Sequence, residues 1–237
     1  MKAFLVMGRT LKAAYDDLFL CVFLSIAFWV GTLALPLIFN SLARLVNLPL
    51  SVVAPVTLLL MLPAAPVTTG IQKATNRIAN YLRVDNSFFW EGTRQYIGRG
   101  FLLFAINLLV PAAIIFNIWF YFNSQGWLPI IGVAWIWLLL LWLLMGQYTF
   151  PLFWQQDSPD LKLVLRNSAL LAVRHPLYSL LMLLFQIVLL AASTALTLPL
   201  ILLAPGLIAL AGNFALAGLL QEIGLAPQPP ETPVKGA

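Results

Sequence analysis

The sequence predicts an all-α membrane protein with six transmembrane helices, and three observations support this fold class. Of its 237 residues, 62% are hydrophobic and 9% are charged, whereas a soluble domain carries roughly 25% charged residues. Six apolar runs reach or approach the about 20 residues that a helix needs to cross a bilayer. Because these runs are apolar on every side, they lack the alternating polarity of a membrane β-barrel. We therefore expect lipid to be the main solvent of this chain.

The expected spans follow directly from the apolar runs. The first run is too long for the roughly 7–15-residue core of a signal peptide, so we expect it to be retained although Lys2, Arg9 and Lys12 precede it. Pro199 and Pro205 bracket the turn before the sixth span. We expect one domain over residues 1–224 and a disordered, Pro-rich cytoplasmic tail over 225–237. The predicted spans are residues 18–39, 48–67, 101–122, 129–153, 177–198 and 200–220.

The distribution of basic residues predicts the orientation of these spans. With the N-terminus inside, twelve of the 13 Lys and Arg residues fall in cytoplasmic segments, and only Arg44 lies outside. This asymmetry is what the positive-inside rule describes. We therefore expect a multi-pass protein of the inner (plasma) membrane with both termini in the cytoplasm.

Two cytoplasmic connections are expected to be amphipathic helices along the membrane interface. In residues 71–82, apolar residues recur at helical spacing and Lys73 and Arg77 fall mostly off that face. In residues 161–171 the same pattern recurs, and Asp157-Ser158-Pro159-Asp160 is typical of a helix N-cap. Basic side chains on such helices favour contact with anionic lipids of the inner leaflet.

Several functional classes find no support in the residue types. The chain has one cysteine, Cys21, and one histidine, His175, and it lacks metal-binding, nucleotide-binding and catalytic motifs. The net charge is +5, and the basic residues lie between apolar runs. A nucleic-acid binder instead clusters its basic residues on one polar face. We therefore expect no catalytic residues, no metal, no cofactor and no nucleic-acid partner, and we predict that the protein is not an enzyme.

Amide side chains are the main polar groups inside the spans, because no span carries a clear charge at mid-depth. The absence of such charges argues against a proton-coupled pump. One interpretation of the amides is a pocket that hydrogen-bonds a sugar-like solute, and the other is hydrogen bonding between helices, worth about 0.6 kcal/mol per contact. The candidate pocket residues are Asn107, Asn117, Gln147, Gln186 and Asn213.

Three segments resemble the YesL-like family of bacterial integral membrane proteins. They are Pro66–Gly70 (PVTTG), Phe88–Tyr96 (FFWEGTRQY), and Gln147–Leu152 (QYTFPL) leading into Leu161–Leu170 (LKLVLRNSAL). The resemblance covers roughly residues 15–220 and leaves out the tail. It implies a multi-helix inner-membrane protein, often found alongside carbohydrate uptake and degradation systems, of a family whose molecular function is unknown. It implies no catalytic residues.

Two functional hypotheses follow. The first is an accessory or permease-like component of carbohydrate uptake, with the carbohydrate part resting on the resemblance. The second is a structural or assembly protein that docks a partner through basic cytoplasmic residues. A transporter subunit, a sensor subunit and a second copy of the chain are the candidate partners. The candidate residues for docking a lipid or a partner are Lys73, Arg77, Arg94, Arg99, Lys162 and Arg166.

Overall fold

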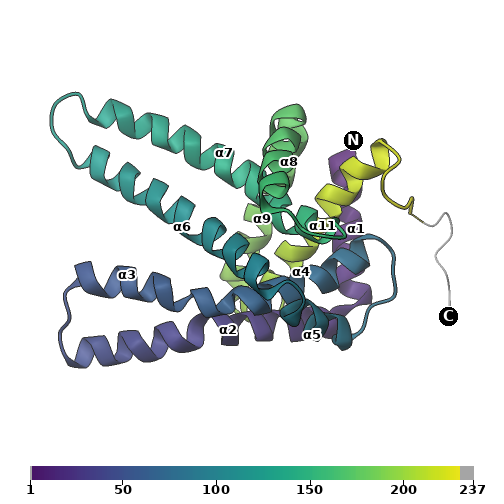
Figure 1. Ribbon diagram of the computed structural model, residues 1–237, viewed down its shortest axis with the longest axis horizontal. Helices are drawn as coiled ribbons and strands as arrows, with labels where there is room; N and C mark the ends of the chain where they lie inside the picture. The colour runs from purple at the N-terminus through teal and green to yellow at the C-terminus, as the bar shows by residue number, and fades with distance from the viewer. Residues whose placement is uncertain (1, 230–237) are drawn as a thin grey trace.

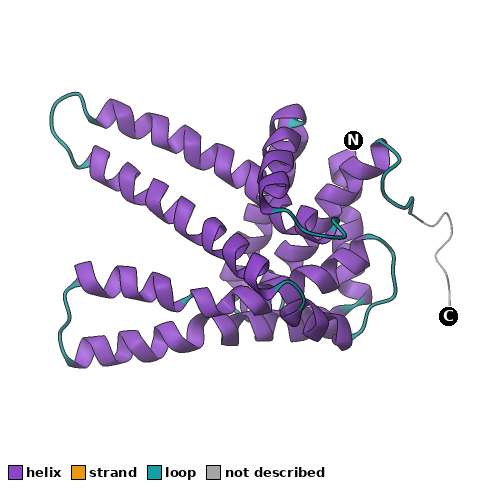
Figure 2. Ribbon diagram, in the orientation of Figure 1, coloured by secondary structure: helices purple, strands orange, loops and turns teal. Residues whose placement is uncertain are grey.

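The computed structural model describes residues 2–229, which form helices joined by short turns and contain no strand (Figures 1 and 2). The all-α class is therefore confirmed. The helices are α1 (Lys2–Asp16), α2 (Leu18–Leu45), α3 (Leu50–Leu60), the 3₁₀ helix η1 (Leu62–Ala64), α4 (Ala65–Ala79), α5 (Asn86–Arg94), α6 (Ile97–Phe122), α7 (Pro129–Trp154), α8 (Leu161–Arg174), α9 (Pro176–Leu196), α10 (Leu198–Leu202) and α11 (Ala204–Glu222).

Six helical segments are long and apolar enough to cross a membrane, as the sequence predicts. The first, third and fourth are α2, α6 and α7, and the fifth and sixth are α9 and α11. The second is longer than expected, because α3, η1 and α4 follow one another over Leu50–Ala79. Between the last two spans, the chain turns through Thr197, which has a φ of 56°, and through the short α10.

Helix α11 forms the centre of the molecule. Thirteen of its 19 residues are buried, and it packs against α1, α2, α4, α7 and α9. Three glycines permit this close packing: a Cβ at Gly206, Gly212 or Gly218 would lie 2.7–3.0 Å from an oxygen atom of α2, α7 or α9, respectively. Each face of α11 is therefore covered by a different helix.

Helix α4 differs from the interfacial helix that the sequence predicts for residues 71–82. Instead of lying along the membrane interface, this segment continues the second span and packs against α2, α5, α6, α7 and α11. Ile71, Ala74 and Thr75 are buried. The polar residues that make the segment look amphipathic contact other helices rather than water, as described below. Pro63 and Pro66 do not end the span, because each occupies the first turn of a new helix, where proline is tolerated.

Two hairpins diverge from this centre (Figure 1). One consists of α2 and α3, which are joined near their ends by a hydrogen bond of 3.0 Å from Asn40 Nδ2 to Thr57 Oγ1. The other consists of α6 and α7, which pack closely together. Helix α3 has no buried residue, so its hairpin offers a large apolar surface to lipid.

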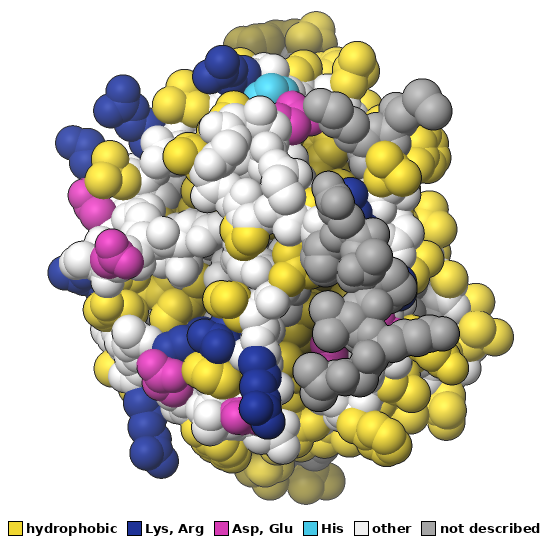
Figure 3. Space-filling model, turned by 90° about the vertical axis from the view of Figure 1, so that its right-hand side faces the viewer, with side chains coloured by type: hydrophobic (Ala, Val, Ile, Leu, Met, Phe, Trp, Pro, Cys, Tyr) yellow, Lys and Arg dark blue, Asp and Glu magenta, His cyan; other side chains and the backbone are white. Residues whose placement is uncertain are grey.

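Charged side chains of both signs gather at the opposite end of the molecule (Figure 3). Hydrogen bonds join its segments: Arg9 of α1 donates to Gln221 of α11 over 3.3 Å, and the Tyr96 hydroxyl donates to the Asp157 carbonyl over 2.6 Å. Asp85 caps α5 by accepting from the backbone N–H of Ser87 at 2.8 Å, and its bonds with Ser87 hold the pKa of its carboxyl below the ordinary value.

Two amphipathic helices flank the spans at this end. Helix α8 begins at the expected place, and the Asp160 carboxylate caps it by accepting from the Lys162 N–H at 3.0 Å. Its buried residues Val164, Ser168 and Ala172 lie on one face, and the helix packs against α7 and α9. Helix α1 packs mainly on α11. Of the expected tail, residues 225–229 continue beyond α11 without a helix, and 230–237 lie outside the described residues.

Candidate functional site

A chain of hydrogen-bonded polar side chains joins α11 to α4 in the interior. The Asn213 side chain is 1% exposed. Its Nδ2 donates to Gln72 Oε1 at 2.8 Å and to Thr75 Oγ1 at 2.9 Å, and its Oδ1 accepts from Asn76 Nδ2 at 3.1 Å. Three polar side chains of α4, those of Gln72, Thr75 and Asn76, are therefore satisfied by α11 inside the protein.

An amide-lined cavity of about 280 Å³ lies beside this chain of side chains. Four amides line it, and each comes from a different helix: Gln72 from α4, Asn107 from α6, Gln147 from α7 and Gln186 from α9. The structure thus brings together three of the five residues predicted from the sequence. The other described lining residues are Pro111, Trp142, Leu143, Gly146, Phe150, Pro151, Leu183, Ile208 and Gly212.

Hydrogen bonds fix the orientation of three of these amides. Gln147 Nε2 donates to the carbonyl of Ser179 at 3.0 Å, and Gln147 Oε1 accepts from Gln186 Nε2 at 3.3 Å. Asn107 Oδ1 accepts from the hydroxyl of Thr149 at 3.2 Å. Bonds of this kind between neighbouring helices hold a binding site in shape before any ligand arrives.

Two polar atoms of the cavity keep hydrogen-bonding capacity to spare. Gln72 uses its Oε1 to accept from Asn213, and Gln186 uses its Nε2 to donate to Gln147. Among the described residues, Gln72 Nε2 and Gln186 Oε1 have no hydrogen-bond partner. The residues that line the cavity therefore include an unpaired donor on α4 and an unpaired acceptor on α9, and hydroxyl groups can pair with both kinds of atom.

The remaining two predicted pocket residues lie elsewhere. Asn213 is separated from the cavity by Gln72, to which it is hydrogen-bonded. Asn117 lies further along α6, where its Nδ2 donates to the carbonyl of Ala113 in its own helix at 2.8 Å. Three of the five amides therefore line one cavity, whereas Asn213 and Asn117 do not line it.

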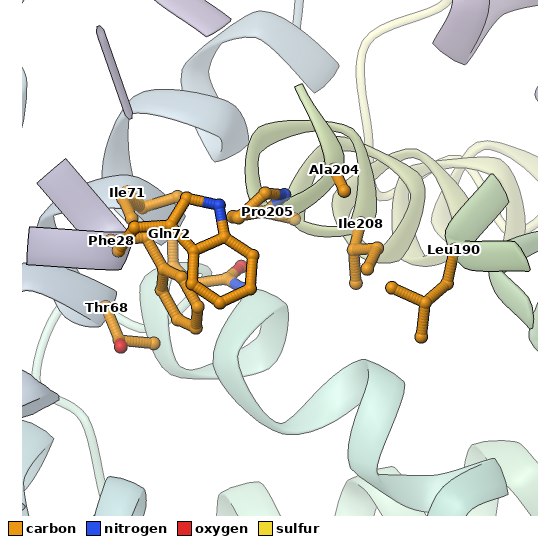
Figure 4. A pocket seen from close by; sticks show the side chains of 10 residues that line it. Phe28, Thr68, Ile71, Gln72, Leu190, Ala204, Pro205 and Ile208 are labelled. Atoms are coloured by element: carbon orange, nitrogen blue, oxygen red, sulfur yellow. The ribbon is translucent and has the colours of Figure 1, made fainter. Parts of the chain in front are cut away.

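A second cavity of about 240 Å³ is lined mainly by apolar side chains. Figure 4 shows Phe28, Thr68 and Gln72 on one side of it and Leu190 on the other, with α11 between them. The Thr68 hydroxyl is already engaged, because it donates to the carbonyl of Ala64 at 3.1 Å. The described lining residues are Phe28, Trp29, Thr68, Ile71, Gln72, Leu190, Ala204, Pro205, Ile208 and Ala209.

The basic residues predicted to dock a lipid or a partner divide into two groups. Lys73 is paired internally: its side chain is 14% exposed, forms an ion pair of 2.6 Å with Glu91 and lies over the ring of Trp154. Arg77 donates to the carbonyl of Arg83, and Arg99 donates to the carbonyl of Pro159 at 2.8 Å. These three cations therefore serve contacts within the chain, and their role in docking a lipid or a partner stays a prediction.

The second group remains available at the surface. The side chains of Arg94, Lys162 and Arg166 are exposed and form no hydrogen bond or ion pair with any described residue. Arg94 ends α5, while Lys162 and Arg166 lie one turn apart on α8. The candidate docking surface of the protein is therefore limited to these three cations.

The segments that carry the resemblance converge in space. Thr69 of the PVTTG segment accepts a hydrogen bond of 3.1 Å from Trp154 Nε1 through its carbonyl. The next residue, Gly70, lies so close to α5 that a Cβ on Gly92 would be 2.9 Å from its Cα. These segments therefore contribute to the packing of α4 against α5 and α7.

Gln72 is the cavity residue that the sequence analysis missed. It lies in the segment 71–82 that the sequence predicts to be an interfacial helix, and in the structure it lines both cavities. One signal pointed to it: the helical periodicity of residues 71–82 begins immediately after the apolar run, so an unbroken span was compatible with the sequence.

No charged residue lines either cavity among the described residues, and no group of His, Cys, Asp or Glu side chains within 2–229 is arranged to hold a metal ion. No family model, curated protein or solved structure matches the chain. The similarity to the YesL-like family therefore stays a prediction.

Proposed function

We propose that this multi-pass membrane protein binds a small uncharged polyol or sugar in the amide-lined cavity, as a permease-like or accessory component of solute uptake. One observation carries this proposal: amides from four of the membrane-span helices converge on one cavity whose described lining residues carry no charge. A volume of about 280 Å³ lies at the small end of ligand sites, which measure about 300–1,000 Å³.

Charge and hydrogen bonding together favour a neutral ligand with hydroxyl groups. An ion in this cavity would lose its hydration without meeting a counter-charge, at a cost that neutral hydroxyls avoid. Gln72 Nε2 and Gln186 Oε1 supply the donor and the acceptor that hydroxyls need. The resemblance to the YesL-like family supports carbohydrate as the solute class.

The orientation and the membrane are part of the same proposal. Lys and Arg side chains gather at the end of the molecule opposite the two hairpins (Figure 3). By the positive-inside rule, they favour a cytoplasmic location for this end, in a bacterial inner membrane. The diverging hairpins would then lie toward the outer side.

The test is binding of radiolabelled neutral sugars and polyols to the purified chain in lipid vesicles. Gln186→Leu removes a neutral hydrogen bond, so we expect affinity to fall about 3–10-fold, and we expect a similar loss for Gln72→Leu. Asn117→Leu is the matched control, because it also replaces an amide inside a span but does not line the cavity.

Two results would count against the proposal. If no neutral solute binds, or if Asn117→Leu lowers affinity as much as Gln186→Leu, the cavity is not the binding site. If the cavity variants lower only the melting temperature, the amides act as hydrogen bonds between helices, which is the other interpretation of these residues.

A second candidate function is docking of a partner on Arg94, Lys162 and Arg166, and the free state of these cations favours it. Arg94→Glu combined with Arg166→Glu should release a transporter or sensor subunit that co-purifies after cross-linking in native membranes. Retention of the partner by this double variant would remove the docking hypothesis.

A further inference from the structure

The two cavities adjoin each other, because Gln72 and Ile208 line both of them. Gln72 comes from α4 and Ile208 from α11. The lining of the cavities changes from polar to apolar across these two side chains. On one side lie the amides of Asn107, Gln147 and Gln186, and on the other lie aromatic and aliphatic side chains.

The second cavity suits a hydrocarbon chain. Phe28, Trp29 and Leu190 provide apolar surface on two sides of it, and its one hydroxyl, on Thr68, is already bonded within the chain. Leu190 is 43% exposed on the outer surface of α9, so the edge of this cavity reaches the surface that faces lipid. A chain could therefore enter from the bilayer without crossing the protein interior.

We propose that the two cavities bind one uncharged amphiphilic molecule, with its hydroxyl-bearing head group among the amides and its hydrocarbon chain beside Phe28 and Trp29. This inference rests on the proposed function and narrows its ligand class to neutral glycolipids and alkyl glycosides. Phospholipids do not fit, because their phosphate would enter a cavity in which no described lining residue carries a positive charge.

The probe for this proposal is a neutral alkyl glycoside that carries a photoreactive diazirine in its alkyl chain. It is added to the full chain in phosphatidylcholine vesicles, and the labelled peptides are identified by mass spectrometry. We expect labelling to concentrate on α2 near Trp29 and on α11 near Ile208, and excess unlabelled alkyl glycoside should suppress it.

Two tryptophan variants test the chain-binding cavity. Leu190→Trp fills the cavity and should reduce labelling of α2 and α11 to the level seen on the lipid-exposed face of α3. Leu184→Trp is the matched control: Leu184 lies on the same helix and is also exposed, at 47%, but lines neither cavity. Labelling that survives Leu190→Trp overturns the proposal.

The head-group cavity is tested in the same vesicles. Gln186→Leu should lower labelling of α2 and α11 about 3–10-fold, as expected for one neutral hydrogen bond. If labelling is unchanged, or if a phosphatidylcholine with a chain diazirine labels the same peptides equally well, the chain binds without a specific head group and the proposal fails.

Failure of this inference is distinguishable from failure of the proposed function. If a chain-free sugar binds and Gln186→Leu weakens its binding, but the alkyl probe labels only lipid-exposed surfaces, the single-amphiphile proposal is overturned and the polyol site stands. If neither the free sugar nor the alkyl glycoside binds, both are overturned.

Discussion

At the scale of single residues, Asn213 is the most connected polar side chain in the interior. It donates to Gln72 and Thr75 on α4 and to Ala209 on its own helix, and it accepts from Asn76. Because Asn213 also holds Gln72 in place, it positions the one side chain that lines both cavities.

We expect Asn213→Leu to destabilise the protein by about 1–3 kcal/mol, because it leaves buried polar groups of α4 unpaired. The measurement is the melting temperature of the purified protein in detergent. Asn117→Leu serves as control and should melt near the wild-type temperature, since Asn117 bonds only within its own helix. Equal melting temperatures for Asn213→Leu and the wild type would show that the hydrogen-bonded chain adds no stability.

Residue type alone was enough to predict part of the candidate site. Asn107, Gln147 and Gln186 stand out as amides within apolar runs, and the cavity includes all three. Their pairing was not predictable, because it depends on how each helix is rotated about its axis. Gln72 could not be separated from its polar neighbours in the sequence, and the internal partners of Lys73 come from α5 and α7, which are distant in the chain.

At the scale of helices, the contact between α4 and α5 depends on two glycines. A Cβ at Gly92 would lie 2.8 Å from Lys73 Cβ and 2.9 Å from Gly70 Cα. Neither of these atoms is the end of a flexible side chain, so the two helices would have to separate to accept a methyl group.

Gly92→Ala should therefore destabilise the protein by about 1–3 kcal/mol and expose residues 80–96 to limited proteolysis. Gly98→Ala is the matched control, because a Cβ there meets no atom within 4 Å. In a helix, this second change should stabilise the protein by about 0.5–1 kcal/mol. If both variants resist trypsin equally, the close approach of α4 and α5 is not required.

The amphipathic pattern of a helix predicted its setting where the pattern had one physical cause. Where the pattern had two causes, it was misleading. In α8, amphipathicity and the Asp160 cap predicted both the helix and its start. In residues 71–82 the same amphipathic pattern arises from hydrogen bonds to α11 and from the Lys73–Glu91 ion pair. A periodicity cannot show whether water or another helix faces its polar side.

At the scale of the whole molecule, the six spans were predictable from apolar length, because each run must cross about 30 Å of hydrocarbon. The central position of α11 was not predicted, although its mean hydropathy of 1.4 is below the 2.0–2.4 of the other five spans. Its glycines became informative only once the helices facing them were known.

The proposed orientation can be tested with introduced cysteines. Native Cys21 is 0% exposed, so it should give little background. Asn167→Cys on α8 should react with a membrane-impermeant maleimide only from the cytoplasmic side, and Gln125→Cys in the turn between α6 and α7 only from the outer side. Reaction of both positions from one side would contradict the six-span topology, and the reversed pattern would contradict the proposed orientation.

The central place of α11 also has a consequence for biosynthesis. The helices that pack on α11, namely α1, α2, α4, α7, α9 and α10, all precede it in the chain, so they leave the ribosome first. Until α11 follows, Gln72, Thr75 and Asn76 lack the Asn213 amide that satisfies them. We therefore expect the earlier spans to be held by the insertion machinery or by water-filled intermediates, and to complete their packing only when α11 arrives among them.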